Sequence, residues 1–99
     1  MRLTENQRQS IKSAVTRVIG EGTRIWLFGS RVDDSKRGGD IDLLIETETV
    51  VPSRVGALCQ LEGALVVRLG NRKIDVLLKD ARTADTPITL AARKTGVLL

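Results

Sequence analysis

The sequence predicts an α/β (α+β) fold in which a small mixed β-sheet is flanked by helices. Three short apolar runs of strand length alternate with two longer segments whose apolar residues recur every three or four positions. The 99 residues are enough for one domain with a modest core, and 41% hydrophobic with 28% charged residues is typical of a globular chain. We therefore interpret residues 1–99 as a single domain.

The first half of the chain predicts one helix and two strands. A helix is expected from Thr4, the N-cap, to Ile19, because apolar residues mark one of its faces and glycines follow it. The apolar run Arg24–Phe28 predicts a buried strand that ends at a Gly-Ser turn. The run Asp40–Glu46 predicts the second strand. A further helix could begin at Ser30.

The second half predicts helix, strand and short helix. After Ser53, apolar residues spaced by three and four indicate a long helix that ends near Gly70, with its apolar side at Val55, Leu58, Leu61, Leu65 and Leu69. The run Lys73–Leu78 predicts the third strand, and Pro87 favours the start of a short helix. The apolar end Gly96–Leu99 is a candidate partner surface.

Composition narrows the chemistry. The sequence has no histidine, which excludes His-ligated zinc, Ser-His-Asp triads and Cys-His nucleophiles. The remaining metal ligands are carboxylate oxygens, which suit magnesium or manganese. The single cysteine, Cys59, cannot form an intrachain disulfide, and we expect it to be a small buried hydrophobe.

Composition also bears on location and partners. The polar first ten residues do not resemble a signal peptide, and no apolar run reaches transmembrane length, so we expect a cytoplasmic protein with no membrane association. The net charge of +4 favours polyanions such as nucleotides. Only Trp26 and Phe28 are aromatic, which disfavours direct binding of nucleic acid through base stacking, and Trp26 is expected in the core.

Three acids lie within the predicted strands. Asp40 and Asp42 project from the same face of one strand because they are two residues apart, and Asp75 joins them if its strand is adjacent. Carboxylates at about 6 Å repel by roughly 3 kcal/mol at an effective dielectric constant near 20, and a divalent cation reverses this. Three carboxylates can share two magnesium ions, as in enzymes of in-line phosphoryl or nucleotidyl transfer.

A phosphate-binding turn is the complementary feature. Gly29 ends the first strand and allows close approach of a ligand, Ser30 adds a hydroxyl donor, and Arg31 could contact a triphosphate. Each of these features also has a structural interpretation. Gly29 and Ser30 could form an ordinary turn, Asp40 and Asp42 could face solvent or pair with Arg31 or Arg37, and Asp75 could pair with Lys73 or Arg72.

Taken together, these residues resemble a known family. Phe28, Gly29, Ser30 and Arg31, followed by Gly39, Asp40, Ile41 and Asp42, are similar to the signature of the minimal nucleotidyltransferases of the DNA polymerase beta-like superfamily. The resemblance implies that superfamily's fold, with ATP as substrate. It also implies that Gly29 and Ser30 hold the phosphates, that Asp40 and Asp42 bind the metals, and that Asp75 is the third carboxylate. The intervening loop, Arg31–Gly39, is slightly shorter than in many members, and Val32-Asp33 replaces a frequent Arg-Gly pair.

The resemblance also implies a partner. Such proteins often pair with a helical HEPN-domain toxin and act as its antitoxin by transferring AMP to it. The sequence has no tyrosine, so a tyrosine acceptor would lie on another chain. Two alternatives stay open: a nucleotide-binding antitoxin that neutralises its partner by masking, and a transferase for a small molecule or an RNA end. A homo-oligomer is compatible with any of these functions.

Overall fold

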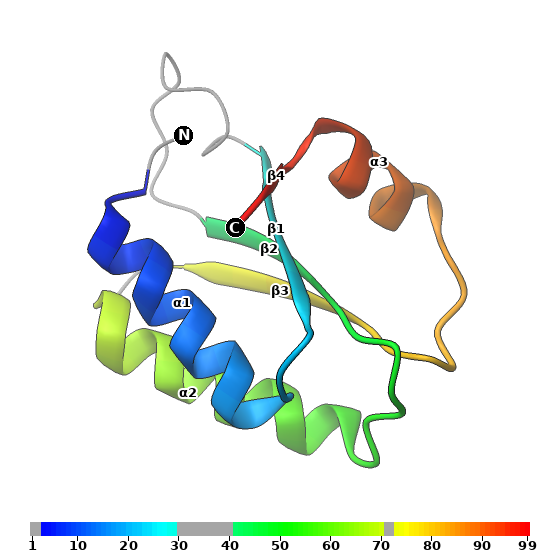
Figure 1. The fold of residues 1–99 in the computed structure, drawn as a ribbon, viewed down its shortest axis with the longest axis horizontal. Helices are drawn as coiled ribbons and strands as arrows, with labels where there is room; N and C mark the ends of the chain where they lie inside the picture. Colours follow the sequence, from blue (N-terminus) through cyan, green and yellow to red (C-terminus); the bar gives the residue numbers. More distant parts are fainter. Residues whose placement is uncertain (1–2, 30–40, 71–72) are drawn as a thin grey trace.

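The computed structural model describes residues 3–29, 41–70 and 73–99. Within these ranges the chain forms three helices and one four-stranded mixed sheet, which confirms the predicted α/β class (Figure 1). The elements follow in the order α1 (Glu5–Val18), β1 (Arg24–Phe28), β2 (Ile41–Glu46), α2 (Arg54–Leu69), β3 (Ile74–Lys79), α3 (Pro87–Thr95) and β4 (Val97–Leu98).

The sheet has the strand order β3-β2-β1-β4. β1 pairs antiparallel with β2 and with β4, whereas β2 and β3 are parallel. A parallel pair needs a crossover connection, and α2 provides it. The three strands expected from the sequence are thus confirmed as neighbours, with β2, the strand of Asp42, between the other two.

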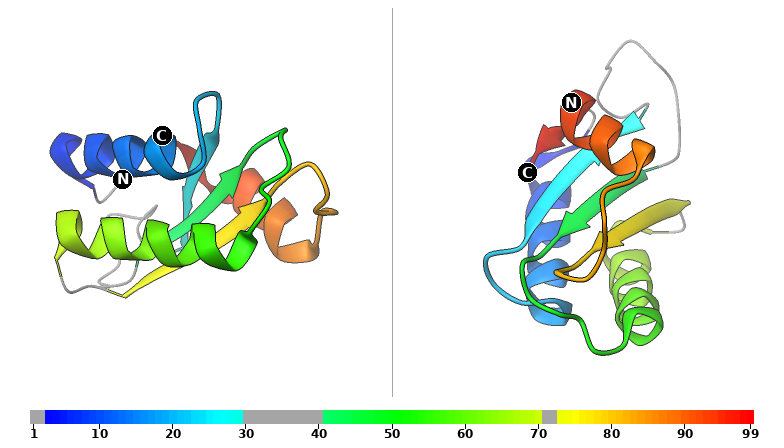
Figure 2. Two further views of the ribbon diagram at one scale, coloured as in Figure 1. Left: turned by 90° about the horizontal axis from the view of Figure 1, so that it is seen from below. Right: turned by 90° about the vertical axis from the view of Figure 1, so that its right-hand side faces the viewer.

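The helices form two layers around the sheet. α1 and α2 lie side by side against one face, and α3 packs on β1 and β2 from the other (Figure 2). The main core lies between the sheet and the first two helices. It includes Ile11 and Val15 of α1, Leu61 and Leu65 of α2, and the alternate residues of β2. The apolar face predicted for the first long helix is therefore buried, as is most of the face predicted for the second.

Local sequence signals set the helix starts. Thr4 caps α1 through a reciprocal pair of hydrogen bonds with Gln7, and Thr86 caps α3 in the same way with Thr89. Ser53 caps α2 by accepting from the Gly56 amide. Each cap satisfies amide groups that the first helical turn leaves without partners, which is why these boundaries could be predicted.

The C-terminal segment corrects one expectation. We interpreted the apolar end Gly96–Leu99 as a partner surface, but Val97 and Leu98 form the edge strand β4 on β1, and Leu99 is buried in the core. The Leu99 amide donates to the Ile25 carbonyl, and Arg8 donates to the Leu99 carbonyl. The chain's own sheet therefore covers most of the segment, and only Leu98 stays exposed.

Two expectations for α2 are also wrong. Cys59 is exposed rather than buried, and Val55, which we placed on the apolar side, is 75% exposed. The buried side of α2 is narrower than predicted and is centred on Leu61, Leu65 and Leu69. Residues 55 and 59 lie one turn apart on the side of the helix that faces away from the sheet.

Candidate functional site

The candidate site lies on the sheet face opposite α1 and α2. Along β2, Ile41, Leu43 and Ile45 enter the main core, so the alternate residues Asp42, Leu44 and Glu46 project from the other face. The strand register places Phe28 of β1 and Asp75 of β3 on either side of Asp42. We call Phe28, Asp42 and Asp75 the Asp42 row.

Asp42 and Asp75 are direct neighbours across the parallel pair of β2 and β3. Asp42 is half-buried, and the Asp75 side chain is 55% exposed. Two carboxylates about 5 Å apart repel by about 1–3 kcal/mol for effective dielectric constants between 80 and 20, so a cation stabilises the arrangement. The Lys73 ammonium lies 4.0 Å from a carboxylate oxygen of Asp75.

Gly29 brings the end of β1 against this pair. Its φ angle of +79° lies in the region that favours glycine, and a Cβ atom built on it would collide with a carboxylate oxygen of Asp42. Position 29 therefore favours glycine for two reasons: the backbone angle is unfavourable for other residues, and a side chain would collide with Asp42.

Three of the six predicted site residues can thus be placed. Gly29, Asp42 and Asp75 come from three different segments and meet at one end of the sheet. Asp40, Ser30 and Arg31 lie outside the described residues. No group of three His, Cys, Asp or Glu side chains arranged to hold a metal occurs in the part of the chain that the structure describes. Asp42 and Asp75 could supply two oxygen ligands, a chemistry that fits magnesium or manganese.

The other end of β2 carries a second acid on the same face. Glu46 is 5% exposed and lies in register between Arg24 and Lys79, which we call the Glu46 row. The Trp26 indole donates to Glu46 at 2.7 Å, and the Arg93 Nε of α3 lies 3.4 Å from its other oxygen. Glu46 therefore joins α3 to the sheet.

Trp26 was expected in the core but lies on this second face, half-buried, because its hydrogen-bond donor needs a partner. Sequence reasoning gave Glu46 no role. Glu46 lies on β2 two residues beyond Leu44, the register partner of Trp26. Only the pairing of β1 with β2 brings the two side chains together.

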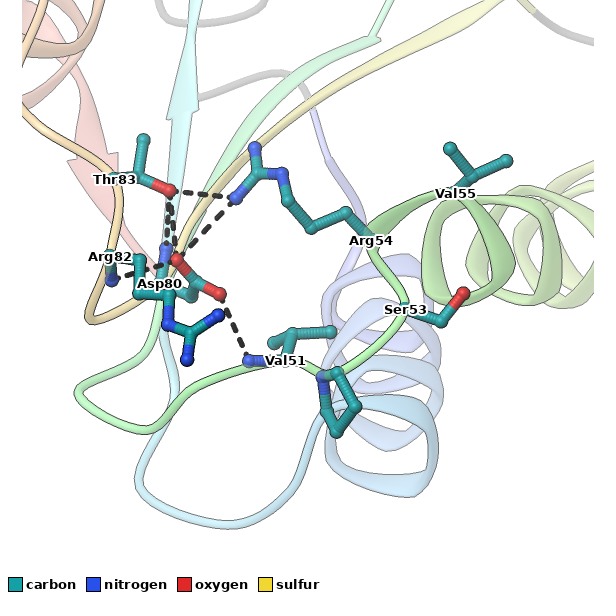
Figure 3. Close-up of a pocket in the computed structure, with 8 residues that line it drawn as sticks. Val51, Ser53, Arg54, Val55, Asp80, Arg82 and Thr83 are labelled. Atoms are coloured by element: carbon teal, nitrogen blue, oxygen red, sulfur yellow. Dashed lines mark hydrogen bonds and ion pairs between the residues drawn. The ribbon is translucent and has the colours of Figure 1, made fainter.

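A hollow of about 550 Å³ opens beside the start of α2, at the carboxyl ends of β2 and β3 (Figure 3). Asp80 lies at its floor and is 2% exposed. Its carboxylate accepts from the Val51 and Arg82 amides and the Thr83 hydroxyl, and Arg54 lies 3.6 Å away. The Val51 amide is the largest of the influences that lower the pKa of Asp80. These donors come from the segments before α2 and after β3, so Asp80 connects the two loops.

Comparison with known proteins gives no further guide to function. The sequence matches no protein-family model and no curated protein. Across residues 3–29, 41–70 and 73–99, none of the helices combines the length and the apolar character that crossing a bilayer requires. The geometry of the Asp42 row is therefore the principal observation on which a function can be proposed.

Proposed function

We propose that this protein is a magnesium-dependent nucleotidyltransferase of the DNA polymerase beta-like superfamily. In the proposed reaction a hydroxyl acceptor forms a bond to the α-phosphorus of ATP, the bond between the α-phosphate and the β-phosphate breaks, and pyrophosphate leaves. One observation carries the proposal: Asp42 and Asp75 are register neighbours, and Gly29 lies against Asp42 with no room for a side chain. A pair of carboxylates beside a close-approach glycine is the arrangement that a metal-bound phosphate needs.

In this proposal each residue has a distinct task. Asp42 and Asp75 would hold the magnesium, which when bound supplies Lewis-acid stabilisation of the charge on the phosphates. Gly29 keeps the β1 turn close enough for backbone amides to donate to phosphate oxygens. Asp75, the more exposed acid, is the candidate to accept the proton of the acceptor hydroxyl. Asp40, Ser30 and Arg31 complete the proposed set as a metal ligand and two phosphate contacts.

The acceptor in this proposal is a partner protein of the HEPN toxin class, and the chain acts as its antitoxin. The Asp42 row supports the proposal because Asp75 lies on the edge strand β3, where a second chain can approach. In the rival account the chain neutralises the partner by masking it. That account needs the same binding of the partner but no transfer of AMP.

The test is transfer of label from ATP carrying a labelled α-phosphate. Purified protein is incubated with magnesium, labelled ATP and lysate of the source cells, beside the Asp42→Asn variant. The control is Glu48→Gln, which alters an exposed acid just past the other end of β2. We expect one labelled protein band with wild type and with the control, and no band with Asp42→Asn.

Two other outcomes would count against the proposal. Equal labelling by wild type and Asp42→Asn would show that the Asp42 row does not catalyse the transfer. Capture of a partner without any labelling would favour the masking account.

Thermal unfolding gives an independent check, because magnesium should raise the melting temperature of wild type more than that of Asp75→Asn.

A further inference from the structure

Lys73 occupies a defined place beside the Asp42 row. Lys73 directly precedes β3. Its carbonyl accepts a hydrogen bond from the Ile41 amide, so the pairing of β3 with β2 extends one residue before Ile74. Because Lys73 and Asp75 are two residues apart on extended backbone, their side chains share a face. The Lys73 ammonium lies 4.0 Å from the Asp75 carboxylate.

The ion pair is weakly held. The side chains of Lys73 and Asp75 are 69% and 55% exposed, and a solvent-exposed pair of this kind contributes little to stability. Lysine carries its charge on a flexible four-carbon stem with three donors, so its ammonium can reach a new acceptor at low cost. β3 is the edge strand, and no further strand of the described sheet lies beyond it.

The positive charge of Lys73 would stabilise a metal-bound nucleoside triphosphate. The triphosphate keeps a net negative charge after one divalent cation has bound, and Asp42 and Asp75 add two more negative charges. A cation beside them would offset the repulsion. If Asp75 held a metal, the Lys73 ammonium would no longer have that carboxylate to itself and could donate to phosphate oxygens bound beside it.

We infer that Lys73 contacts the phosphate groups of the metal-bound nucleotide and is held at the site by Asp75 when the ligand is absent. The inference rests on the proposed function, and it names a substrate-contacting residue that the acid and glycine pattern does not include. Lysine is the residue type that binds phosphate as a point charge.

The experiment compares Lys73→Ala with Lys79→Ala by titration calorimetry. Lys79 is a lysine at the other end of the same strand and the same face, opposite Glu46, and serves as the matched control. Each protein is titrated first with Mn²⁺ alone and then, in saturating Mn²⁺, with an ATP analogue that cannot be cleaved at the α-phosphate. Circular dichroism verifies that the variants are folded, and Lys73→Gln is a second variant of similar length.

We expect the Lys73→Ala substitution to weaken nucleotide binding without weakening the binding of Mn²⁺ alone. Loss of one charge-assisted hydrogen bond should weaken nucleotide binding by Lys73→Ala about 10-fold or more. Binding of Mn²⁺ alone should be unchanged or up to about 5-fold tighter, because a competing charge has left Asp75. Lys73→Gln should follow Lys73→Ala, and Lys79→Ala should follow wild type.

Two results would overturn the inference while wild type binds the metal–nucleotide complex. Lys73→Ala could bind the nucleotide as wild type does, or it could lose metal and nucleotide affinity in the same proportion, as expected for a residue that only supports Asp75. In either case the proposed function would stand. If wild type itself binds no nucleotide in the presence of metal, the proposed function and the inference fail together.

Discussion

The two ends of β2 carry acids on the same sheet face but in opposite surroundings. Glu46 lies in register between Arg24 and Lys79, is almost fully buried, and accepts from Trp26. Asp42 lies between Phe28 and a second acid, Asp75, at a more open part of the face. One strand thus places one acid among cations and donors and the other beside a like charge.

This difference teaches how to separate a structural acid from a candidate functional one. Burial of a carboxylate is costly unless donors compensate it, and Glu46 has such donors within the fold. Asp42 and Asp75 are neighbouring carboxylates that repel each other, and a cation bound from solution would lower this repulsion. The predictions below test this contrast, from the largest expected effect to the smallest.

Asp42→Asn should have the largest effect and should act on function. We expect nucleotidyl transfer to fall by more than about 100-fold, because a lost metal ligand removes several kcal/mol of charge stabilisation. The free energy of unfolding should fall by less than about 1 kcal/mol, because the relief of repulsion from Asp75 offsets the interactions that the Asp42 carboxylate loses. Transfer assays and urea unfolding measure the two quantities. A large fall in the free energy of unfolding with unchanged nucleotidyl transfer would show that Asp42, like Glu46, has a structural role.

Gly29→Ala should affect both stability and function. The positive φ angle and the collision with Asp42 together should cost about 1–3 kcal/mol in the free energy of unfolding. Gly22 provides the matched control, because its φ angle is +78° and a Cβ atom there meets open space. Gly22→Ala should show only the cost of the backbone angle. Equal losses for the two variants, measured by urea unfolding, would show that the contact with Asp42 adds nothing.

Glu46→Gln should act on stability alone. The amide can still accept from Trp26, but Arg93 and Arg24 lose the negative charge that they face, so we expect a loss of about 1–2 kcal/mol. The exposed acid Glu48 is the control, and Glu48→Gln should change stability by less than about 0.5 kcal/mol. Transfer activity should stay within about 3-fold of wild type once the protein is folded. A much larger loss of activity would mean that α3 positions the site.

Asp80→Asn should lower the free energy of unfolding above about pH 4, and this difference from wild type should disappear at acid pH. The pKa of Asp80 is lowered from its ordinary value of 3.8 mainly by the Val51 amide, with smaller contributions from Thr83, Arg82 and Arg54. A folded-state pKa below the unfolded value stabilises the protein above about pH 4, and this stability is lost as the pH falls through the folded pKa. Urea unfolding at several pH values should show a shallower acid decline for Asp80→Asn than for wild type. Parallel curves would contradict the prediction.

Much of the fold could be predicted because its signals are local. The caps at Thr4, Ser53 and Thr86 and the apolar periodicities depend only on nearby residues. β4 could not be predicted, since two residues carry too little pattern and their strand exists only because the edge of β1 is available. The exposure of Cys59 was missed because spacing alone does not show how wide the buried side of a helix is.

The candidate site divides in the same way. Its residue types and their order along the chain were visible in the sequence, and so was the two-residue alternation that puts Asp42 on one face of its strand. The tertiary structure decided that β2 and β3 are parallel with Asp42 beside Asp75, that Gly29 lies against Asp42, and that Glu46 lies among cationic side chains. The physical reason is that strand alternation is a property of the local backbone, whereas register and neighbours are set by the joint packing of the helices and the sheet.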